Sequence, residues 1–465
     1  MSPARLPALL AIALTAVLAV TLAGPFGGGA TAAAPAAPAA AGAADGGTAG
    51  NPVTPGNFTG LGFDQCLAPE QWKMNKWLQH SPFLAVGIYI SGDSRACRNQ
   101  PNLTPRWVAT QLRKGWRLLP ITLGPQASCQ PRFPRYHDDF KISPKPGTSG
   151  RYSIARRMGR VEATKAVATA KALGIVPRST LWYDLEGFDA SNKNCRESAL
   201  AFLHAWTRRL HDLDYVSGVY SSAGSGIRAL DDARVNRPNA FVLPDRIWIA
   251  RWDGRANTST SYIREDGWRP GNRMKQFQGG HDETWGNVRI NIDRNFLDLG
   301  SKAVAYEKHC GGVNLNFRKY QALRPPADGY KPPASKVRAL QCLLKKKRLY
   351  DGRTHGRYDA RTIGAVNAWH AKLGVGASPN WSRRDWVTLL ANGKRPVQKF
   401  GSTGVYVRRV QRALNAADVR NRLRVSGRYD GATQAAMRRY QAQVKLPASG
   451  ITNNITWGRL RAGRY

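Results

Sequence analysis

Short apolar runs alternate with amphipathic stretches between Asn57 and about Gly300. Eight runs have the length and composition of β-strands, at residues 61–66, 85–91, 117–124, 181–186, 217–222, 247–252, 274–279 and 289–296. The stretches between the early runs predict helices at residues 69–79, 104–114, 160–173 and 197–213. Strands that alternate with helices over roughly 240 residues predict an α/β fold, a (β/α)8 TIM-like barrel of parallel strands. An open doubly wound sheet is the alternative, because the later helices are poorly marked.

The first 56 residues have a different composition. Arg5 precedes an apolar run from Leu6 to about Ala23, which small residues follow, and this predicts a secretory signal peptide at residues 1–32. The run is nearly long enough to span a bilayer, so an uncleaved N-terminal anchor is the alternative. Residues 33–56 are rich in Ala, Pro and Gly and predict a flexible linker.

The last 130 or so residues contain an internal repeat. The run VRALQCLL at 337–344 returns as VRRVQRAL at 407–414, and GRYDARTIGA at 356–365 returns as GRYDGATQAA at 427–436. Each copy predicts a small helical module in which the GRYD turn leads into a second helix.

This ordered set of motifs resembles the peptidoglycan-binding domain family of three-helix modules. The resemblance implies two peptidoglycan-binding repeats after the barrel, with the domains at residues 57–302 (barrel), 303–334 (linker), 335–395 (repeat 1) and 396–465 (repeat 2).

The charge of the chain points to an anionic partner. The formal net charge is +40, and residues 331–465 alone carry 29 Lys and Arg against 5 Asp. For an exported protein such partners are peptidoglycan or another anionic cell-wall glycan, with wall teichoic acid as a further contact, rather than nucleic acid. We therefore expect a secreted, wall-associated monomer.

The cysteines and histidines limit the kinds of reaction that the protein can catalyse. The six cysteines are Cys66, Cys97, Cys129, Cys195, Cys310 and Cys342. An even number in an exported protein predicts three disulfides, for which the sequence alone allows 15 connectivities. No Cys or His spacing is that of a metal site, so no metal or cofactor is expected.

Four carboxylates fall where a barrel would build its active site. Asp184 and Glu186 lie two residues apart in LWYDLEGFD at 181–189, so along a strand they would point the same way. Asp64 and Asp293 are expected at the ends of the first and eighth strands, which are neighbours in a closed barrel. Crowding raises the pKa of at least one member, which is the requirement for the acid in glycosidic bond cleavage.

Other side chains near the predicted strand ends suit a carbohydrate. We expect sugar rings to stack on the aromatic residues Tyr183, Tyr220, Trp252 and Trp285. Arg251 and Gln276 are expected to bind substrate oxygens.

At these residues the chain resembles known glycosidases. The motifs GFD, DLE, GVYSS, IWIARW and KQFQGG…NIDRNF follow in the order of glycoside hydrolase family 25, the muramidase type of lysozyme. GFDQCLAP, GWRLLPITLGPQASC and GGHDETWG are more similar to the secreted glycoside-hydrolase-like domain of unknown function 1906, a family-25-like barrel, over about residues 58–299.

Roles and pairings follow from the resemblance. It implies that Glu186 is the general acid, that Asp184 and Asp293 support the substrate or its developing positive charge, and that Asp64 is the first-strand carboxylate. Two disulfides are expected between cysteines that follow neighbouring strands, Cys66 with Cys97 and Cys129 with Cys195. The third would join Cys310 to Cys342 of the first repeat.

The sequence therefore favours a secreted wall glycoside hydrolase, a muramidase, guided by its C-terminal repeats. A catalytically inactive wall-binding or scaffold protein with a retained sugar groove is the alternative. A zinc amidase and a cysteine nucleophile are disfavoured by the absence of ligand spacing and by the predicted pairing of every cysteine. Inverting, retaining and substrate-assisted mechanisms all remain open.

Overall fold

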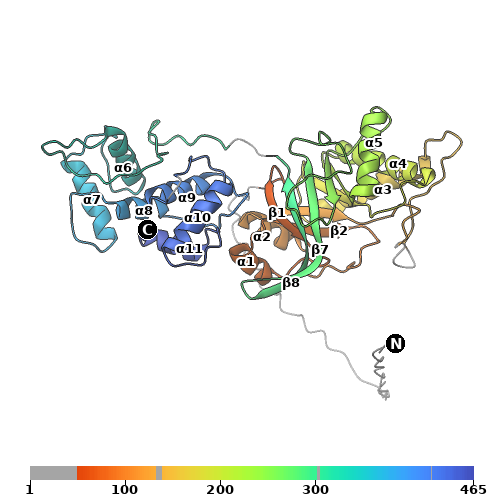
Figure 1. The fold of residues 1–465 in the computed structure, drawn as a ribbon, viewed down its shortest axis with the longest axis horizontal. Coiled ribbons are helices and arrows are strands. Elements are labelled where there is room, and N and C mark those ends of the chain that lie inside the picture. Colours follow the sequence, from red (N-terminus) through yellow and green to blue (C-terminus); the bar gives the residue numbers. More distant parts are fainter. Residues whose placement is uncertain (1–49, 132–138, 301–303, 420–421) are drawn as a thin grey trace, which may run out of the picture. The chain divides into compact units, whose positions relative to one another are not determined.

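The computed structural model describes residues 50–131, 139–300, 304–419 and 422–465 (Figure 1). The predicted signal peptide and most of the predicted linker lie outside these residues. The described part of the chain contains no helix that is both long and apolar enough to cross a membrane.

Eight strands close into a barrel in sequence order. They are β1 (Thr59–Asp64), β2 (Ala85–Ser91), β3 (Arg117–Thr122), β4 (Thr180–Asp184), β5 (Val216–Ser222), β6 (Arg246–Ala250), β7 (Arg273–Trp285) and β8 (Val288–Asp298). Each strand overlaps one of the eight predicted apolar runs. The closed barrel is confirmed, and the open sheet is excluded.

The direction of the last strand differs from the prediction. Strands β1 to β7 pair in parallel, but β8 is antiparallel to both β7 and β1. Only Gly286 and Asn287 connect β7 to β8, and both have positive φ, +59° and +63°. Two such residues form the hairpin turn that suits antiparallel strands, whereas a parallel pair needs a long crossover. Asp293 therefore lies inside β8 and not at its end, where an all-parallel barrel would have placed it.

Helices cover the first five strands. They are α1 (Gln71–His80), α2 (Pro105–Lys114), α3 (Ser153–Ala172), α4 (Lys193–Asp212) and α5 (Arg228–Asn236), and the first four overlap the predicted helices. Sequence signals start two of them: the Thr104 side chain accepts from the Trp107 amide before α2, and Asn192 accepts from the Cys195 amide before α4. Residues 251–272, between β6 and β7, contain turns and no helix.

Tryptophans fill the barrel interior beneath the strand ends. Trp182 of β4 and Trp248 of β6 are buried and meet edge to face, with ring centroids 5.6 Å apart. The Trp248 indole nitrogen donates to Asn295 Oδ1 at 2.8 Å. This contact ties the packed interior to a polar side chain of β8.

The chain just before β1 is part of the folded barrel. Thr54, which the sequence assigned to the flexible linker, is buried, and its Oγ1 donates to the Leu118 carbonyl at 2.8 Å. The Thr180 amide donates to the Thr54 carbonyl at 2.9 Å. The ordered barrel segment therefore begins before residue 57.

Three disulfides join the cysteines as expected: Cys66–Cys97, Cys129–Cys195 and Cys310–Cys342. Each links residues whose Cα atoms lie 5.7 to 5.9 Å apart. No cysteine is left free to act as a nucleophile.

The C-terminal region forms two three-helix units. The helices are α6 (Ala334–Lys346), α7 (Ala360–Lys372) and α8 (Arg383–Ala391), then α9 (Val405–Ala416), α10 (Gly431–Gln443) and α11 (Asn454–Arg461). The aspartate of each GRYD turn, Asp359 or Asp430, caps the second helix by accepting from the backbone of Thr362 or Thr433.

One buried glutamine repeats between the units. Gln341 accepts from the Gly356 amide at 3.0 Å and donates to the Arg357 carbonyl at 2.9 Å. Gln411 makes the same two bonds, both at 2.9 Å, to Gly427 and Arg428. The sequence repeat is therefore a structural repeat.

Candidate active site

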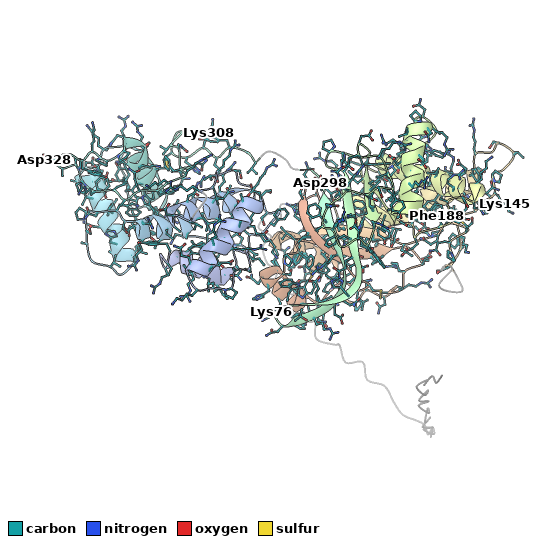
Figure 2. The ribbon with its side chains drawn as sticks, in the orientation of Figure 1. Lys76, Lys145, Phe188, Asp298, Lys308 and Asp328 are labelled. Atoms are coloured by element: carbon teal, nitrogen blue, oxygen red, sulfur yellow. A yellow bond between two sulfur atoms is a disulfide. The ribbon has the colours of Figure 1, made fainter. Side chains whose placement is uncertain are left out.

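Two carboxylates end parallel strands at the same edge of the barrel. Asp64 is the last residue of β1 and Asp184 the last of β4, and each is only 3% exposed. Phe188, in the loop after β4, lies beyond this end, whereas Asp298 of β8 pairs with Thr59 at the opposite end (Figure 2). The carboxyl ends of the strands thus form the site, as in other TIM-like barrels.

Asp293 faces Asp64 across the closure of the barrel. The two residues are direct partners in the antiparallel pairing of β1 and β8, and Gln276 Nε2 lies within 3.4 Å of carboxyl oxygens of both. The predicted neighbourhood of Asp64 and Asp293 is confirmed, although it arises from antiparallel register.

The pKa values of both members of the pair are raised. Burial raises the pKa of Asp64 well above its ordinary value and Asp293 raises it further, although hydrogen bonds from Asn295 and Gln276 oppose the shift. Burial raises the pKa of Asp293 to about 6, while the positive charge of His281 opposes the shift and the charge of Glu186 adds to it. Two carboxyl groups that share a small volume cannot both ionise freely.

Glu186 lies two residues beyond the end of β4 and is half-buried. Its amide donates to Gln126 Oε1 at 2.8 Å, and Gln126 Nε2 donates to the Asp184 carbonyl at 2.8 Å. The fully buried Gln126 therefore braces the loop that carries Glu186. Sequence reasoning missed this residue, although its position just after the third strand could have indicated it.

The pKa of one tyrosine responds to the charges of all four carboxyl groups. Burial raises the pKa of Tyr220 well above its ordinary value, and the charges of Glu186, Asp184, Asp64 and Asp293 raise it further. Such interactions require proximity, so the four predicted carboxyl groups all lie near Tyr220. A second tyrosine that the sequence reasoning missed, Tyr89 of β2, donates to Asp184 Oδ2 at 3.4 Å.

Gln276 connects the carboxyl pair to two aromatic residues. Its Nε2 donates to Asp293 Oδ2 at 3.1 Å and approaches both Asp64 oxygens at 3.4 Å. Its Oε1 accepts from the Tyr220 hydroxyl at 3.0 Å and from the Trp252 indole at 2.9 Å. With 2% exposure and these partners, Gln276 holds other side chains in place instead of offering free groups to a substrate.

Asn295 of β8 holds the Asp64 carboxyl group by a hydrogen bond. Its Nδ2 donates to Asp64 Oδ1 at 2.5 Å, and its Oδ1 accepts from Trp248. The sequence reasoning missed Asn295, although it lies two residues from Asp293 and therefore on the same face of the strand.

Trp252 and Arg251 form the exposed rim of the site. Trp252 is 66% exposed, and its ring covers Gly279 so closely that a Cβ there would come within 2.5 Å of it. Arg251 is exposed and lies over the Tyr262 ring, 5.1 Å from its centroid. Both side chains remain available to a ligand.

Two predicted sugar-binding aromatics lie elsewhere. Tyr183 is fully buried on the outer face of β4, where it contacts Phe202 and Trp206 of α4, because neighbouring strand residues point to opposite faces. Trp285 ends β7 at the hairpin turn and donates to Glu283 Oε2 at 2.7 Å. It lies five residues along β8 from Asp293, about 16 Å away. Neither position fits sugar stacking beside the carboxylates.

Within the described residues, no group of three or more His, Cys, Asp or Glu side chains is placed to hold a metal ion. What the candidate site does offer is two carboxyl groups with raised pKa values beside two others, near the exposed indole of Trp252. That combination suits acid-assisted cleavage of a glycosidic bond.

Comparison with known proteins agrees with this class of site. Residues 75–297 match the family model of the Rv2525c-like, glycoside hydrolase-like domain, and residues 403–460 match that of the peptidoglycan binding domain. The chain therefore carries a glycoside hydrolase-like domain with a peptidoglycan-binding domain at its C-terminal end. No curated protein matches the chain.

Several solved structures match part of the chain at low sequence identity. An uncharacterized B. stearothermophilus protein is 18% identical over 51% of this chain and 95% of its own, with a TM-score of 0.32. The Tat-secreted protein Rv2525c of Mycobacterium tuberculosis, in complex with L-tartrate, is 12% identical over the same shares, with a TM-score of 0.34. A GH18 chitinase from Pseudoalteromonas aurantia is 10% identical over 46% of this chain and 79% of its own, with a TM-score of 0.26. No functional argument rests on scores this low.

Proposed function

We propose that this protein is a secreted, wall-associated glycoside hydrolase that cleaves the glycan strand of peptidoglycan as a muramidase. The observation that carries the proposal is the pairing of Asp64 with Asp293 across the barrel closure, with Asp184 and Glu186 nearby. A site for neutral ligands has no need to gather two buried and two half-buried carboxyl groups, because burial without use costs stability.

Each carboxylate has a role in this proposal. Glu186 is the most accessible of the three carboxyl groups at or beyond the ends of β1 and β4, so it protonates the leaving oxygen as general acid. Asp184 and Asp293 stabilise positive charge at the anomeric carbon, and Asp64 supports Asp293. Trp252 stacks on a sugar ring, and Arg251 binds substrate oxygens.

The C-terminal units would bring the enzyme to its substrate. The peptidoglycan-binding match covers the second unit, and we propose the same role for the first, at residues 335–395, on the basis of the shared glutamine geometry. The excess of basic residues there suits carboxylates of peptidoglycan and phosphates of wall teichoic acid. Three disulfides support an oxidising location outside the cytoplasm, and we propose that the protein acts as a monomer.

Release of reducing sugar from purified peptidoglycan tests the function. The mature protein is expected to release muropeptides whose new reducing ends are N-acetylmuramic acid, which mass spectrometry after borohydride reduction identifies. Glu186→Gln should abolish release, whereas Glu70→Gln, an exposed glutamate paired with Lys73 on α1, should retain it.

The second candidate, a wall-binding protein with a retained sugar groove, predicts a different result. Wild type and Glu186→Gln would then sediment equally with peptidoglycan and release no sugar from any wall preparation. Reducing ends of N-acetylglucosamine would instead identify a glucosaminidase and overturn the muramidase assignment.

A further inference from the structure

The barrel domain has a cavity of about 1160 Å³ that none of the four site carboxylates lines. Its walls come from the loop before α3, from the loop after β4 with the first turn of α4, and from the π-helix η1 (Ala223–Ile227) with α5. Two of these walls follow directly from β4 and β5, at the end of the barrel that carries the candidate active site. A volume above the roughly 300–1,000 Å³ of most small-molecule sites suits an extended ligand.

The loop after β4 borders both the candidate active site and the cavity. Phe188, labelled in Figure 2, lines the cavity and follows Glu186 by two residues, which span at most about 7 Å. The Phe188 amide donates to Ser225 Oγ at 3.4 Å, and a Cβ on Gly187 would be 3.2 Å from Ser222 Cβ. The loop is therefore held against the end of β5 and η1.

The rim of the site approaches the cavity at a second point. Arg251 lies over the Tyr262 ring, 5.1 Å from its centroid. Gly224 lines the cavity and packs against the same ring, since a Cβ on Gly224 would be 3.1 Å from a Tyr262 ring carbon. A substrate group bound by Arg251 would therefore be separated from the cavity wall by a single aromatic ring.

Two cations on the cavity wall have little role in the fold. Lys193 is the exposed first residue of α4, and it makes no ion pair with any residue that the structure describes. A cation there does not stabilise the helix, because the positive end of the helix dipole lies at the N-terminus. Arg228 is 62% exposed and lies 3.7 Å from Asp232, which is 47% exposed, and solvent weakens such a pair. Both side chains are therefore available to a carboxylate.

The other two cations among the described lining residues hold helices together. Arg237, just after α5, donates to the two Glu197 oxygens at 2.8 and 3.2 Å, and Arg196 Nε donates to Glu197 Oε1 at 3.3 Å. Glu197 belongs to α4, so the Arg237 bonds fix the end of α5 against α4 and shape the cavity. Arg196 and Arg237 are therefore structural.

The cavity also offers an anion and apolar surface. Asp189 is exposed and accepts from the amide and the hydroxyl of Ser191, at 3.0 and 2.6 Å, and these bonds lower the pKa of Asp189 and keep it ionised at neutral pH. Phe188, Ala190 and Ala229 add apolar groups to the wall. Cations, an anion and small apolar surfaces together suit a short peptide that carries carboxylates and an amine better than they suit an uncharged sugar chain.

We propose that this cavity binds the peptide that peptidoglycan carries on its N-acetylmuramic acid, with Lys193 and Arg228 contacting its carboxylates and Asp189 contacting the amine of its diamino acid. The inference deepens the proposed function and rests on it. A muramidase cleaves the bond on the reducing side of N-acetylmuramic acid, so the sugar beside Glu186 is the one that bears the peptide. The short step from Glu186 to Phe188 brings the cavity within reach of that peptide.

Binding of the free peptide tests the site without any need for hydrolysis. The probe is N-acetyl-L-alanyl-γ-D-glutamyl-meso-diaminopimelyl-D-alanine, titrated into the full chain by calorimetry. The Kd should rise in Lys193→Gln and in Arg228→Gln, and by at least about tenfold in the double variant, because charge-assisted bonds are lost. These substitutions leave the C-terminal units unchanged, so a weakened binding site belongs to the cavity.

Arg208→Gln is the matched control for the loss of charge. Arg208 is exposed on the same helix, about 22 Å from Lys193 along the axis, and does not line the cavity. Its Kd should equal that of the wild type. Equal Kd values for wild type and the double variant, or an equal rise in Arg208→Gln, would overturn the proposal.

The amine contact is tested with a second peptide. This peptide has the free amine of its diaminopimelate acetylated as well. It should bind the wild type more weakly than the first peptide does, whereas Asp189→Asn should bind the two peptides equally. Equal affinity of the wild type for both peptides would overturn the role of Asp189.

Hydrolysis separates this inference from the proposed function. Peptide-bearing glycan strands are compared with strands from which an amidase has removed the peptides. The wild type should cleave the peptide-bearing strands with at least about fivefold higher kcat/KM, and the Lys193→Gln, Arg228→Gln double variant should lose this preference. Equal kcat/KM of the wild type on both strands would leave a hydrolase and overturn the role of the cavity. Cleavage of neither strand would overturn the proposed function, while peptide binding that weakens in the double variant would still assign the cavity to the peptide.

Discussion

Asp64 at the end of β1 and Asp293 inside β8 are direct partners in an antiparallel strand pair, and the same side-chain nitrogen, Gln276 Nε2, lies within 3.4 Å of both carboxyl groups. The two strands are far apart in sequence and meet only because the barrel closes. Four consequences of this site geometry can be measured.

The buried pair should make stability depend on pH. Both carboxyl groups have folded-state pKa values above their ordinary ones, and because of Asp293 the folded protein binds more protons than the unfolded chain between about pH 4 and pH 6. The stability present below this window is lost as pH rises through it, by on the order of 2 kcal/mol.

Asp64→Asn keeps the shape of the pair and removes one titrating group. Urea unfolding at pH 4, 5, 6 and 7 should give a shallower decline in the free energy of unfolding for this variant than for the wild type. Equal slopes in the two proteins would show that the pair does not carry the shared proton.

Replacing Gln276 should impair turnover more than binding. Gln276→Met has similar volume but cannot donate to Asp293 or accept from Tyr220 and Trp252. We expect kcat on soluble glycan fragments to fall at least about tenfold with a smaller change in KM, because the reacting groups lose their orientation. A change confined to KM would instead indicate that Gln276 binds substrate directly.

Trp252 should contribute to glycan affinity without supporting the fold. Its ring is mostly exposed, so Trp252→Ala is expected to raise the Kd for glycan fragments about tenfold with little effect on the melting temperature. Trp72→Ala on α1 is the matched control, since Trp72 is also exposed (54%). Equal Kd values for Trp252→Ala and wild type in calorimetric titrations would remove Trp252 from the binding site.

Adding a side chain at Gly279 should displace the Trp252 ring that packs against it. In Gly279→Ala the new Cβ would lie 2.5 Å from the Trp252 ring, so the indole must move and lose its bond to Gln276. Affinity for glycan should fall toward that of Trp252→Ala, and tryptophan fluorescence should shift.

Gly364→Ala is the control for Gly279→Ala. Gly364 lies within α7, and a methyl group there would meet no atom within 4 Å, so alanine is expected to stabilise the helix by about 0.5–1 kcal/mol. Unchanged affinity and fluorescence in Gly279→Ala would mean that Trp252 needs no fixed orientation.

Much of this protein follows from local patterns in its sequence. The alternation of apolar and polar positions located all eight strands and four of the barrel helices, because side-chain periodicity is a property of each segment. The repeated GRYD motif predicted both C-terminal units, since the aspartate caps the helix that follows it. Placing carboxylates at strand ends found Asp64, Asp184 and Glu186.

Tertiary structure decided the direction of β8 and the contacts of Asn295 and Gln126. The Gly286–Asn287 turn was a local signal for the hairpin, but its consequence for Asp293 depends on register against β1. Register and side-chain partners across distant strands are set by how the closed barrel packs, and no periodicity within one segment encodes them.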